Sequence, residues 1–296
     1  MNETVSQTLR EAYDACLTIA QSHYENFPVA SRLLPSHLRP HVAAVYAFAR
    51  TADDFADEPG RTTEERLRLL SEWCVQLHAD PGSRLPDPVF IALHDTIAKF
   101  ALPVQLLDDL LDAFTQDVTT TRYGSWSAVL DYCRRSANPV GRLVLRLTGY
   151  RDDSLDRASD AVCTALQLTN FWQDLALDWR RGRLYVPEEI WRAHGADPSA
   201  LDTARMSPAW SAALADCSQR TRRLFTEGRP VCDGVRGRLR YELRATWLGG
   251  TRILDRLERS GFDVFTRRPS LGTADGIVVA LGTLLWRATP PSPIRS

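Results

Sequence analysis

The sequence predicts an all-α protein, and three observations carry that prediction. Hydrophobic residues recur at helical spacing along the whole chain, whereas period-two alternation bounded by hairpin turns is hard to find. The breaks between helical segments fall at prolines and glycines, and none is long enough to link two domains. The 296 residues are 44% hydrophobic and 25% charged, as in soluble globular proteins that bury a large core. We therefore expect a single helical domain over residues 1–289, followed by a short proline-rich tail at residues 290–296.

Helical periodicity and its interruptions define each expected element. In chain order the predicted helices cover residues 3–24, 37–57, 62–79, 86–99, 103–119, 125–147, 153–180, 208–227, 233–261 and 270–287. The breaks between them contain Pro35, Pro59, Gly60, Pro81, Gly82, residues 86–88, Pro103, Gly149, Gly182, Pro187 and Pro230. Proline lacks the N–H that a helix interior needs and glycine is a weak helix former, so these positions mark helix ends.

The charge composition excludes several classes of function. With 36 basic and 37 acidic residues the net charge is -1, so the chain lacks the basic excess of a nucleic-acid binder, and no nucleic-acid partner is expected. Lys99 is the only lysine, which argues against Schiff-base chemistry and against a phosphate-loop lysine.

The six cysteines and the apolar segments indicate the compartment. We identify neither a Cys-x-x-Cys pair nor a histidine partner at metal-ligand spacing, so the cysteines are predicted to be free thiols in a reducing compartment. No signal peptide is evident in the first thirty residues. The longest apolar stretch, residues 277–286, is too short to span a bilayer and is either a buried closing helix or a contact with a membrane surface. A cytoplasmic protein is expected, and peripheral attachment to the inner face of the membrane is left open.

The pattern Asp-Asp-x-x-Asp occurs three times, at residues 53–57, 108–112 and 152–156. On a helix this pattern places carboxylates one turn apart, which suits a Mg²⁺ ion that also binds a diphosphate. The second copy lies opposite the apolar stripe of an amphipathic helix and is predicted to be a solvated face. The third copy follows Gly149 and opens a helix, where acidic residues cap free amides and oppose the helix dipole.

The first copy differs because the helix before it, residues 42–49, is apolar nearly all round and is expected to be buried. One polar line along this helix contains Tyr46, Arg50, Asp53, Asp54 and Asp57. Burying clustered carboxylates costs several kcal/mol unless a counter-charge arrives, and a single Arg50 cannot neutralise three acids. We therefore predict a metal site here; the alternative is a surface charge run at a helix end.

A second polar line occurs on the helix predicted at residues 153–180. It contains Gln167, Asn170, Asp174 and Asp178. Apolar residues frame this line on both sides, with Leu168, Phe171 and Leu175 on one side and Leu166 and Leu177 on the other. The pattern predicts the wall of a cavity, and two such helices are expected to hold Mg²⁺ and a phosphorylated ligand. The arginines that follow, Arg180, Arg181 and Arg183, suit either diphosphate oxygens or the negative end of the helix dipole.

These motifs resemble the squalene/phytoene synthase family of head-to-head prenyl synthases over nearly the whole chain. The matching segments are residues 46–57, 132–141 and 167–187. The resemblance implies the all-α isoprenoid synthase fold, a single helical bundle in which helices surround a deep apolar cavity closed at one end by two Mg²⁺-binding aspartate motifs.

The resemblance also implies roles for individual residues. The expected Mg²⁺ ligands are Asp53, Asp57, Asn170, Asp174 and Asp178, with Asp54 in support. The expected diphosphate contacts are Arg50, Arg183, Tyr46 and Tyr185, and the residues expected at the reacting carbons are Gln167 and Tyr132. Phe27 matches an aromatic residue of the cavity, and Asn26 or Tyr132 is a candidate for orienting a water molecule.

Within the family, residues 23–31, 136–141 and 170–174 are similar to the hydroxysqualene synthase branch of bacterial hopanoid pathways. This branch takes presqualene diphosphate, removes the diphosphate and lets water capture the rearranged cation. The resemblance implies association with a presqualene diphosphate synthase and with a flavin-dependent squalene-forming enzyme. No Gly-x-Gly-x-x-Gly motif follows a strand, and no nicotinamide cofactor is expected. The alternatives are a presqualene diphosphate, squalene or phytoene synthase, and a catalytically silent helical assembly or adaptor protein.

Overall fold

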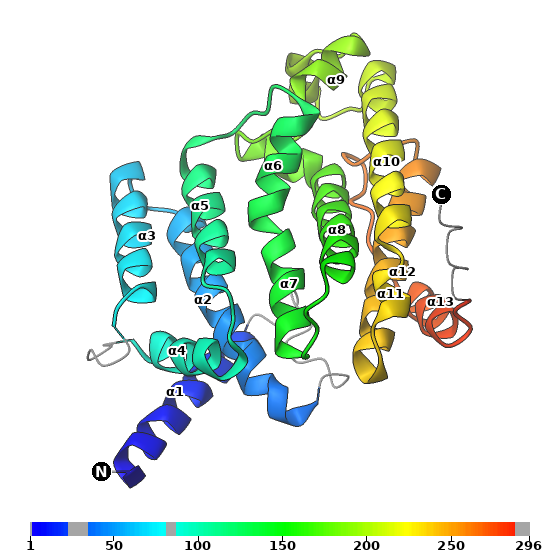
Figure 1. Cartoon of the computed structure of the whole chain (residues 1–296). Coiled ribbons are helices and arrows are strands. Elements are labelled where there is room, and N and C mark those ends of the chain that lie inside the picture. The colour runs from blue at the N-terminus through cyan, green and yellow to red at the C-terminus, as the bar shows by residue number, and fades with distance from the viewer. Residues whose placement is uncertain (1, 23–34, 81–86, 288–296) are drawn as a thin grey trace, which may run out of the picture. The chain divides into compact units, whose positions relative to one another are not determined.

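The structure is a computed structural model that describes residues 2–22, 35–80 and 87–287 (Figure 1). Within these residues every regular element is a helix, so the all-α prediction is confirmed, and the only strand-like pairing is a bridge between Arg122 and Leu184. The chain forms two compact units, one of Met1–Thr120 with Pro139–Arg151 and one of Thr121–Asn138 with Asp152–Ser296. The predicted tail at residues 290–296 lies outside the described residues.

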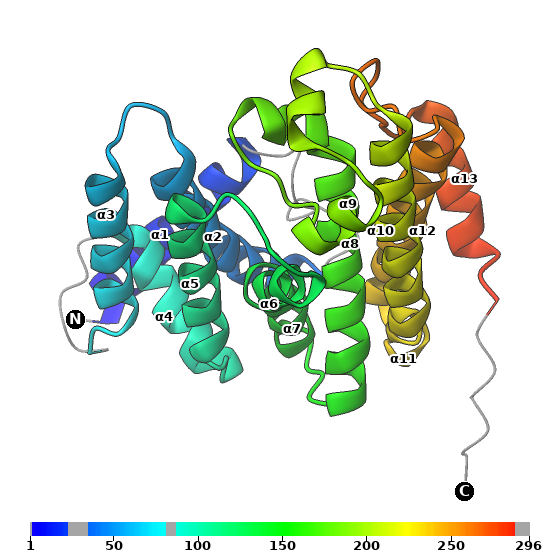
Figure 2. The same cartoon turned by 90° about the horizontal axis from the view of Figure 1, so that it is seen from above.

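In the first unit, helices pack around α2. Its elements are α1 (Asn2–Ser22), the 3-10 helix η2 (Ser36–Leu38), α2 (Arg39–Asp57), α3 (Thr63–Leu77), α4 (Pro88–Phe100), α5 (Gln105–Thr119) and α7 (Asn138–Leu147). Helix α2 contacts α1, α3, α4 and α5 and is the central helix of this unit (Figures 1 and 2). The predicted burial of its first half is confirmed, since Val42, Ala43, Ala44, Ala47 and Phe48 are all buried.

Aromatic rings fill the core of the first unit beside α2. Phe48 stacks on Trp73 of α3 with ring centroids 6.1 Å apart, and Trp73 meets Phe90 of α4 edge to face at 4.3 Å. The indole N–H of Trp73 donates a hydrogen bond to the carbonyl of Phe48 over 3.3 Å, so its polar atom is satisfied although it is buried. These contacts hold the middle of α2 in place, so the acidic residues at its C-terminal end follow a well-packed segment of the same helix.

A polar network joins α1, α2 and α4. The Tyr13 hydroxyl donates to Asp95 over 2.5 Å, and Nδ1 of His41 lies 2.9 Å from the same hydroxyl. Lys99 donates from Nζ to Nε2 of His41 over 3.1 Å. Burial lowers the pKa of His41 and the neighbouring Lys99 lowers it further. The only lysine of the chain therefore has a structural partner.

In the second unit, helices pack around α8. Its elements are α6 (Trp126–Ser136), α8 (Asp153–Arg180), α9 (Glu188–Ala193), the 3-10 helix η3 (Pro198–Thr203), α10 (Pro208–Gly228), α11 (Val231–Gly234), α12 (Gly237–Arg259) and α13 (Thr273–Leu284). Helices α8 and α10 lie side by side, and the Trp172 indole donates to the Thr221 hydroxyl over 2.9 Å. A Cβ on Gly228 would lie 2.6 Å from Cγ2 of Val162, so the close approach of these helices requires glycine there.

The helix boundaries correct the sequence prediction in two places and confirm it in a third. The segment predicted as one helix at residues 125–147 is two helices, because Pro139 lacks an N–H and its ring clashes with the carbonyl four residues earlier. The short helices α9, η3 and α11 were not predicted, since six or fewer residues carry no measurable period. The third acidic copy was correctly predicted as a cap: Asp152 accepts hydrogen bonds from the backbone N–H groups of Ser154 and Leu155 at 2.8 and 3.1 Å.

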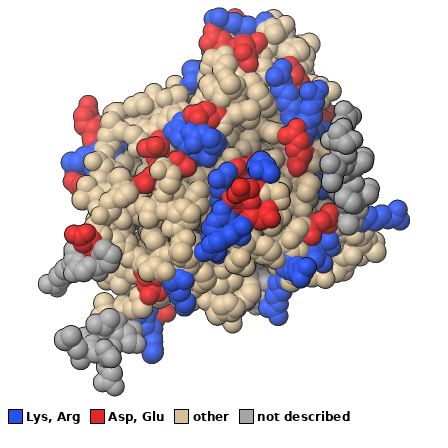
Figure 3. Space-filling view, viewed as in Figure 1, with Lys and Arg blue, Asp and Glu red and all other residues tan. Residues whose placement is uncertain are grey.

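On the face drawn in Figure 3, basic and acidic side chains lie in small mixed groups. In the described part of the chain, no helix is long and apolar enough to cross a membrane.

Candidate active site

The first acidic set lies in the last two turns of α2. The guanidinium of Arg50 bridges two of the three carboxylates, with Nη1 3.1 Å from Oδ2 of Asp53 and Nη2 2.6 Å from Oδ1 of Asp54. The side chains of Arg50, Asp53 and Asp54 are all partly accessible to solvent. A helix that is buried in its first half thus ends in carboxylates that reach the surface.

Two arginines outside α2 hold its end in place. Arg61 donates to the carbonyl of Asp54 over 3.0 Å, and Arg66 donates to the carbonyls of Ala56 and Glu58, the latter over 2.9 Å. These guanidiniums offset the partial negative charge at the helix C-terminus, which would otherwise oppose the nearby carboxylates. Sequence reasoning missed both residues, although basic residues just past a helix end are a recognisable pattern.

Tyr46 belongs to the same group as the acids. It lies one turn before Arg50 and is partly buried. Burial raises the pKa of its hydroxyl, Arg50 lowers it, and Asp53 and Asp54 raise it. The phenol is therefore neutral, and its pKa depends on the charges of Arg50, Asp53 and Asp54. Tyr46, Arg50, Asp53 and Asp54 are electrostatically connected on one helix, as predicted.

The second acidic set lies on α8. Gln167, Asp174 and Asp178 are partly buried and Asn170 is exposed. The predicted apolar frame is present on one side, where Leu168, Phe171 and Leu175 are buried. On the other side the prediction was wrong at its last position, because Leu177 is 42% exposed. The polar line leaves the apolar surroundings towards the end of the helix.

Arg268 contacts this set from a distant part of the sequence. Its guanidinium pairs with both carboxylate oxygens of Asp174, with Nη2 3.0 Å from Oδ2. The next residue, Pro269, accepts a hydrogen bond from the side-chain amide of Gln173. The segment before α13 is thus fastened to α8 at two adjacent positions. No local pattern predicts a pair 94 residues apart, and sequence reasoning did not find Arg268.

The chain turns sharply after α8 at Gly182, whose φ of 80° lies in the left-handed region that glycine adopts readily. The N–H of Arg183 donates to the carbonyl of Asp178 over 2.8 Å, and the N–H of Leu184 donates to the carbonyl of Thr121 over 2.9 Å. Of the three arginines predicted as diphosphate ligands or helix-end charges, Arg180 and Arg181 are exposed and Arg183 is partly buried.

Four aromatic rings form a cluster in the second unit: Tyr123, Tyr132, Phe171 and Tyr185. All four are buried. The rings of Phe171 and Tyr185 stack in parallel with centroids 3.8 Å apart, and the Tyr132 ring lies 6.0 Å from Phe171 and 6.1 Å from Tyr185. The cluster contains Tyr132 and Tyr185, both of which the family resemblance implies as site residues. It also contains Tyr123, which lies in a segment of the sequence without helical periodicity.

The predicted residues therefore form one group on α2 and one group around α8. Asn26 and Phe27, together with His23, lie outside the described residues. Both acidic sets present carboxylate oxygens at one-turn spacing, the ligands that Mg²⁺ prefers. Both also attract a guanidinium, Arg50 in one set and Arg268 in the other, which shows that each has the charge to hold a cation. The side chains fit a divalent metal.

Solved structures of known proteins have the same all-α fold. A crystal structure described as squalene synthase HpnC from Alicyclobacillus acidocaldarius is 38% identical, superposes with a TM-score of 0.81, and matches over 86% of this chain and 96% of its own. A dehydrosqualene synthase structure at 20% identity has the same TM-score over 95% of this chain and 98% of its own, and shows the fold alone. The fold is that of the all-α isoprenoid synthases.

The sequence comparisons define the family. The sequence model of squalene/phytoene synthases matches residues 20–275. A hydroxysqualene synthase from Rhodopseudomonas palustris is 34% identical over 88% of both chains, and one from Zymomonas mobilis is 37% identical over 71% of both. The chain belongs to the squalene/phytoene synthase family, whose members act on prenyl diphosphates and generally depend on a divalent metal.

Proposed function

We propose that this protein converts presqualene diphosphate to hydroxysqualene in a Mg²⁺-dependent reaction of squalene and hopanoid biosynthesis. The observation that carries the proposal is the 34–37% identity to hydroxysqualene synthases over 71–88% of the chain, above the 25–27% identity to phytoene synthases. The reaction breaks the bond between carbon and the diphosphate oxygen, which leaves with the electron pair. Water then forms a new carbon–oxygen bond to the rearranged cation and loses a proton. No electron donor is needed, so no nicotinamide enters the proposal.

On α2, Asp53 and Asp57 would hold Mg²⁺, with Asp54 in support. Arg50 and Tyr46 would contact the diphosphate. Arg50 already pairs with Asp53 and Asp54, and in the loaded site its guanidinium would bind a phosphate oxygen in place of a carboxylate. Tyr46 can donate its proton in a hydrogen bond because burial raises the pKa of its hydroxyl.

On α8, Asn170, Asp174 and Asp178 would hold Mg²⁺, and Arg183 and Tyr185 would contact the diphosphate from the segment that follows. Bound Mg²⁺ would supply positive charge to the departing diphosphate. Asp174 must then exchange its pair with Arg268 for the metal, which frees a guanidinium.

The aromatic cluster would protect the cation. Tyr132, Phe171 and Tyr185 are buried, so this wall excludes water and presents polarisable rings. The Tyr185 ring stacks on the Phe171 ring, and Tyr132, which carries both an aromatic ring and a hydroxyl, lies beside the two. We assign Tyr132 and Gln167 to the reacting carbons, with Tyr132 or Asn26 orienting the water.

The test is product analysis with purified presqualene diphosphate and Mg²⁺ in water labelled with heavy oxygen, with and without NADPH. We expect labelled hydroxysqualene in both cases. Squalene formed only with NADPH would identify a squalene synthase instead. Conversion of farnesyl or geranylgeranyl diphosphate to presqualene diphosphate or phytoene would identify the corresponding synthase. Absence of turnover with every diphosphate would favour an assembly or adaptor role.

We further propose that α13 rests on a membrane surface. Ile277, Val278, Leu281, Leu284 and Leu285 are 46–76% exposed and recur on one side of the helix and its C-terminal residue. The helix is held at both ends: Asp275 pairs with Arg252 and Arg256, and the Trp286 indole donates to Asp233 over 2.9 Å. An apolar stripe held in place in this way can be buried in the surface of a lipid bilayer, into which the substrate and product partition.

The charges near α13 favour an anionic lipid surface. Arg267 and Arg287 are exposed on either side of the helix in the sequence, where they can meet lipid headgroups. A protein at the inner face of the membrane would receive presqualene diphosphate from the synthase that makes it and pass hydroxysqualene to the flavin-dependent enzyme that reduces it.

A further inference from the structure

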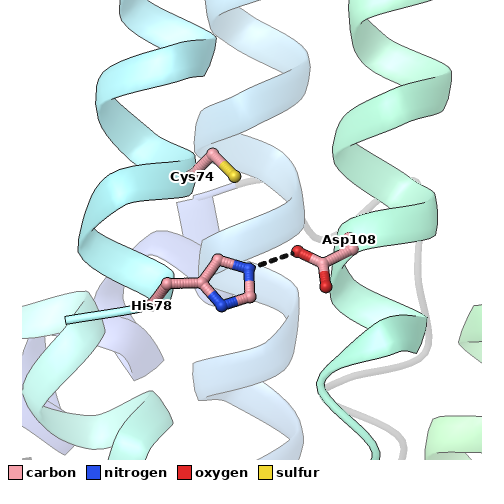
Figure 4. Close-up of side chains that lie close together, drawn as sticks. All are labelled: Cys74, His78 and Asp108. Carbon is pink, nitrogen blue, oxygen red and sulfur yellow. Dashed lines mark hydrogen bonds and ion pairs between the residues drawn. The ribbon is translucent and has the colours of Figure 1, made fainter. Parts of the chain in front are cut away.

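Three side chains capable of binding a metal meet between α3 and α5, in a part of the molecule that the proposed reaction does not use. Cys74 and His78 come from α3 and its C-terminal cap, and Asp108 comes from the first turn of α5 (Figure 4). One ligand atom of each lies within 4.8 Å of those of the other two. Nε2 of His78 lies 2.7 Å from Oδ1 of Asp108. A sulfur, a nitrogen and an oxygen donor therefore lie close enough together to share one ion.

The backbone holds this arrangement. Cys74 and His78 are four residues apart, so their side chains lie on the same side of the helix. The N–H of His78 donates to the carbonyl of Cys74 over 3.2 Å, which closes the last turn of α3. The N–H of Asp108 donates to the carbonyl of Val104 over 3.1 Å at the start of α5. Both helices belong to the same compact unit and contact each other.

The charges around Cys74 attract a cation and disfavour a free, reactive thiolate. Burial raises the pKa of the Cys74 thiol, and the carboxylates of Asp108 and Asp112 raise it further. A thiol in this setting stays protonated and is a poor nucleophile. The same two carboxylates attract a metal ion, whose charge would reverse the effect and stabilise the thiolate.

We propose that Cys74, His78 and Asp108 bind a zinc-type metal ion that joins α3 to α5. Thiolate and imidazole ligands suit Zn²⁺ and do not suit Mg²⁺, so this site differs in chemistry from the acidic sets. Zinc–ligand bonds of about 2.0–2.3 Å place tetrahedral ligand atoms about 3.5 Å apart, so side-chain rotations of about 1 Å would complete the site. On binding, Cys74 would release its proton to solvent, Nε2 of His78 would give up any proton it carries, and water would take the fourth position.

The experiment uses Co²⁺ as a spectroscopic probe of the full-length protein freed of metal. We expect a thiolate-to-cobalt charge-transfer band and the strong visible bands of tetrahedral cobalt, saturating at a single ion per chain at micromolar concentration, and removed by competing Zn²⁺. Cys74→Ala should abolish the charge-transfer band, and His78→Ala or Asp108→Asn should weaken binding at least tenfold. Cys163→Ala, at another partly buried cysteine, and Asp109→Asn are matched controls that should keep the full spectrum.

Thermal unfolding gives a second readout. With Mg²⁺ in excess to occupy the acidic sets, Zn²⁺ should raise the melting temperature of the parent protein and raise that of His78→Ala much less, while circular dichroism shows that both are folded. The proposal is overturned if the charge-transfer band is absent, if it survives in Cys74→Ala, or if saturation needs millimolar metal. His78→Gln, which keeps the size of the side chain, replaces His78→Ala if that variant does not fold. None of these outcomes depends on which prenyl diphosphate the protein consumes.

Discussion

The guanidinium of Arg268 and the carboxylate of Asp174, 94 residues apart in the chain, form an ion pair in which Nη2 lies 3.0 Å from Oδ2. Asp174 is one of the two acids of the polar line on α8. Its charge is therefore already balanced in the substrate-free protein, and a metal ion that binds there must compete with an internal cation.

The first prediction concerns this competition. Arg268→Gln removes the internal cation, so Mg²⁺ should bind the substrate-free protein several-fold more tightly, as measured by calorimetry. Arg267→Gln, at the exposed neighbouring arginine, should leave the affinity within about twofold of the parent. Weaker Mg²⁺ binding by Arg268→Gln would show that Arg268 helps to hold the metal site together.

The second prediction concerns the choice among the three acidic copies. Asp53→Ala, Asp57→Ala, Asp174→Ala and Asp178→Ala should each lower turnover by about 10²- to 10³-fold, because the charge on the departing diphosphate is then poorly compensated. Steady-state kinetics at saturating Mg²⁺ measures the effect, and circular dichroism should show intact folds.

The other two copies supply the controls. Asp109→Ala and Asp153→Ala change the same side chain in the second and third copies and should leave turnover within about twofold of the parent. If Asp109→Ala were as damaging as Asp53→Ala, the metal site would have been assigned to the wrong copy.

The third prediction is a pH dependence of α13. The backbone N–H of Gly272 and the guanidiniums of Arg252 and Arg256 hold the pKa of the buried Asp275 at about 2, below its usual 3.8. A lowered pKa stabilises the folded state above the ordinary value and loses that effect as the pH falls through about 2. Asp275→Asn should therefore melt several degrees lower than the parent near neutral pH, and the gap should shrink between about pH 4 and pH 2. A gap that is constant across this range would show that the charge of Asp275 does not hold α13.

The fourth prediction tests the membrane surface. Replacing Ile277, Leu281 and Leu284 together by Gln should abolish flotation with vesicles that contain anionic lipid, because the exposed apolar stripe is lost while its buried face is kept. Val75→Gln, at a 69% exposed apolar residue of the other compact unit, is the control and should float like the parent. Equal flotation of the triple variant and the parent would remove α13 from consideration. Loss of a dimer in the triple variant, measured by sedimentation, would identify a second copy of the chain as the occupant of the stripe.

Several features of the site could be predicted from short-range patterns. Tyr46, Arg50 and Asp54 fall on one line of α2 because residues four apart share a helix face. The cap at Asp152 followed from an acid placed after a glycine and before a periodic segment. The break at Pro139 was equally visible in the sequence and was overlooked. The spacing of Cys74 and His78, four residues apart, is also visible in the sequence, and the structure brings their ligand atoms within 4.8 Å of each other and of Asp108.

The second acidic copy shows where local patterns stop. Its position opposite an apolar stripe predicted a solvated face, and Asp112 is exposed as expected. Asp108 is only 25% exposed and pairs with His78, which lies on another helix. A helical wheel shows which side of α5 Asp108 occupies but not which neighbouring helix faces that side.

The sequence by itself determined the helical class, the family, and the two lines of polar residues, because helical periodicity depends on residues three and four positions apart. Only the tertiary structure decided which distant groups meet: Arg268 with Asp174, Tyr185 stacked on Phe171, and Asp108 beside His78. These contacts depend on how whole helices pack and where turns such as Gly182 send the chain. The free energy that selects such packing is spread over many buried side chains and has no short-range period in the sequence.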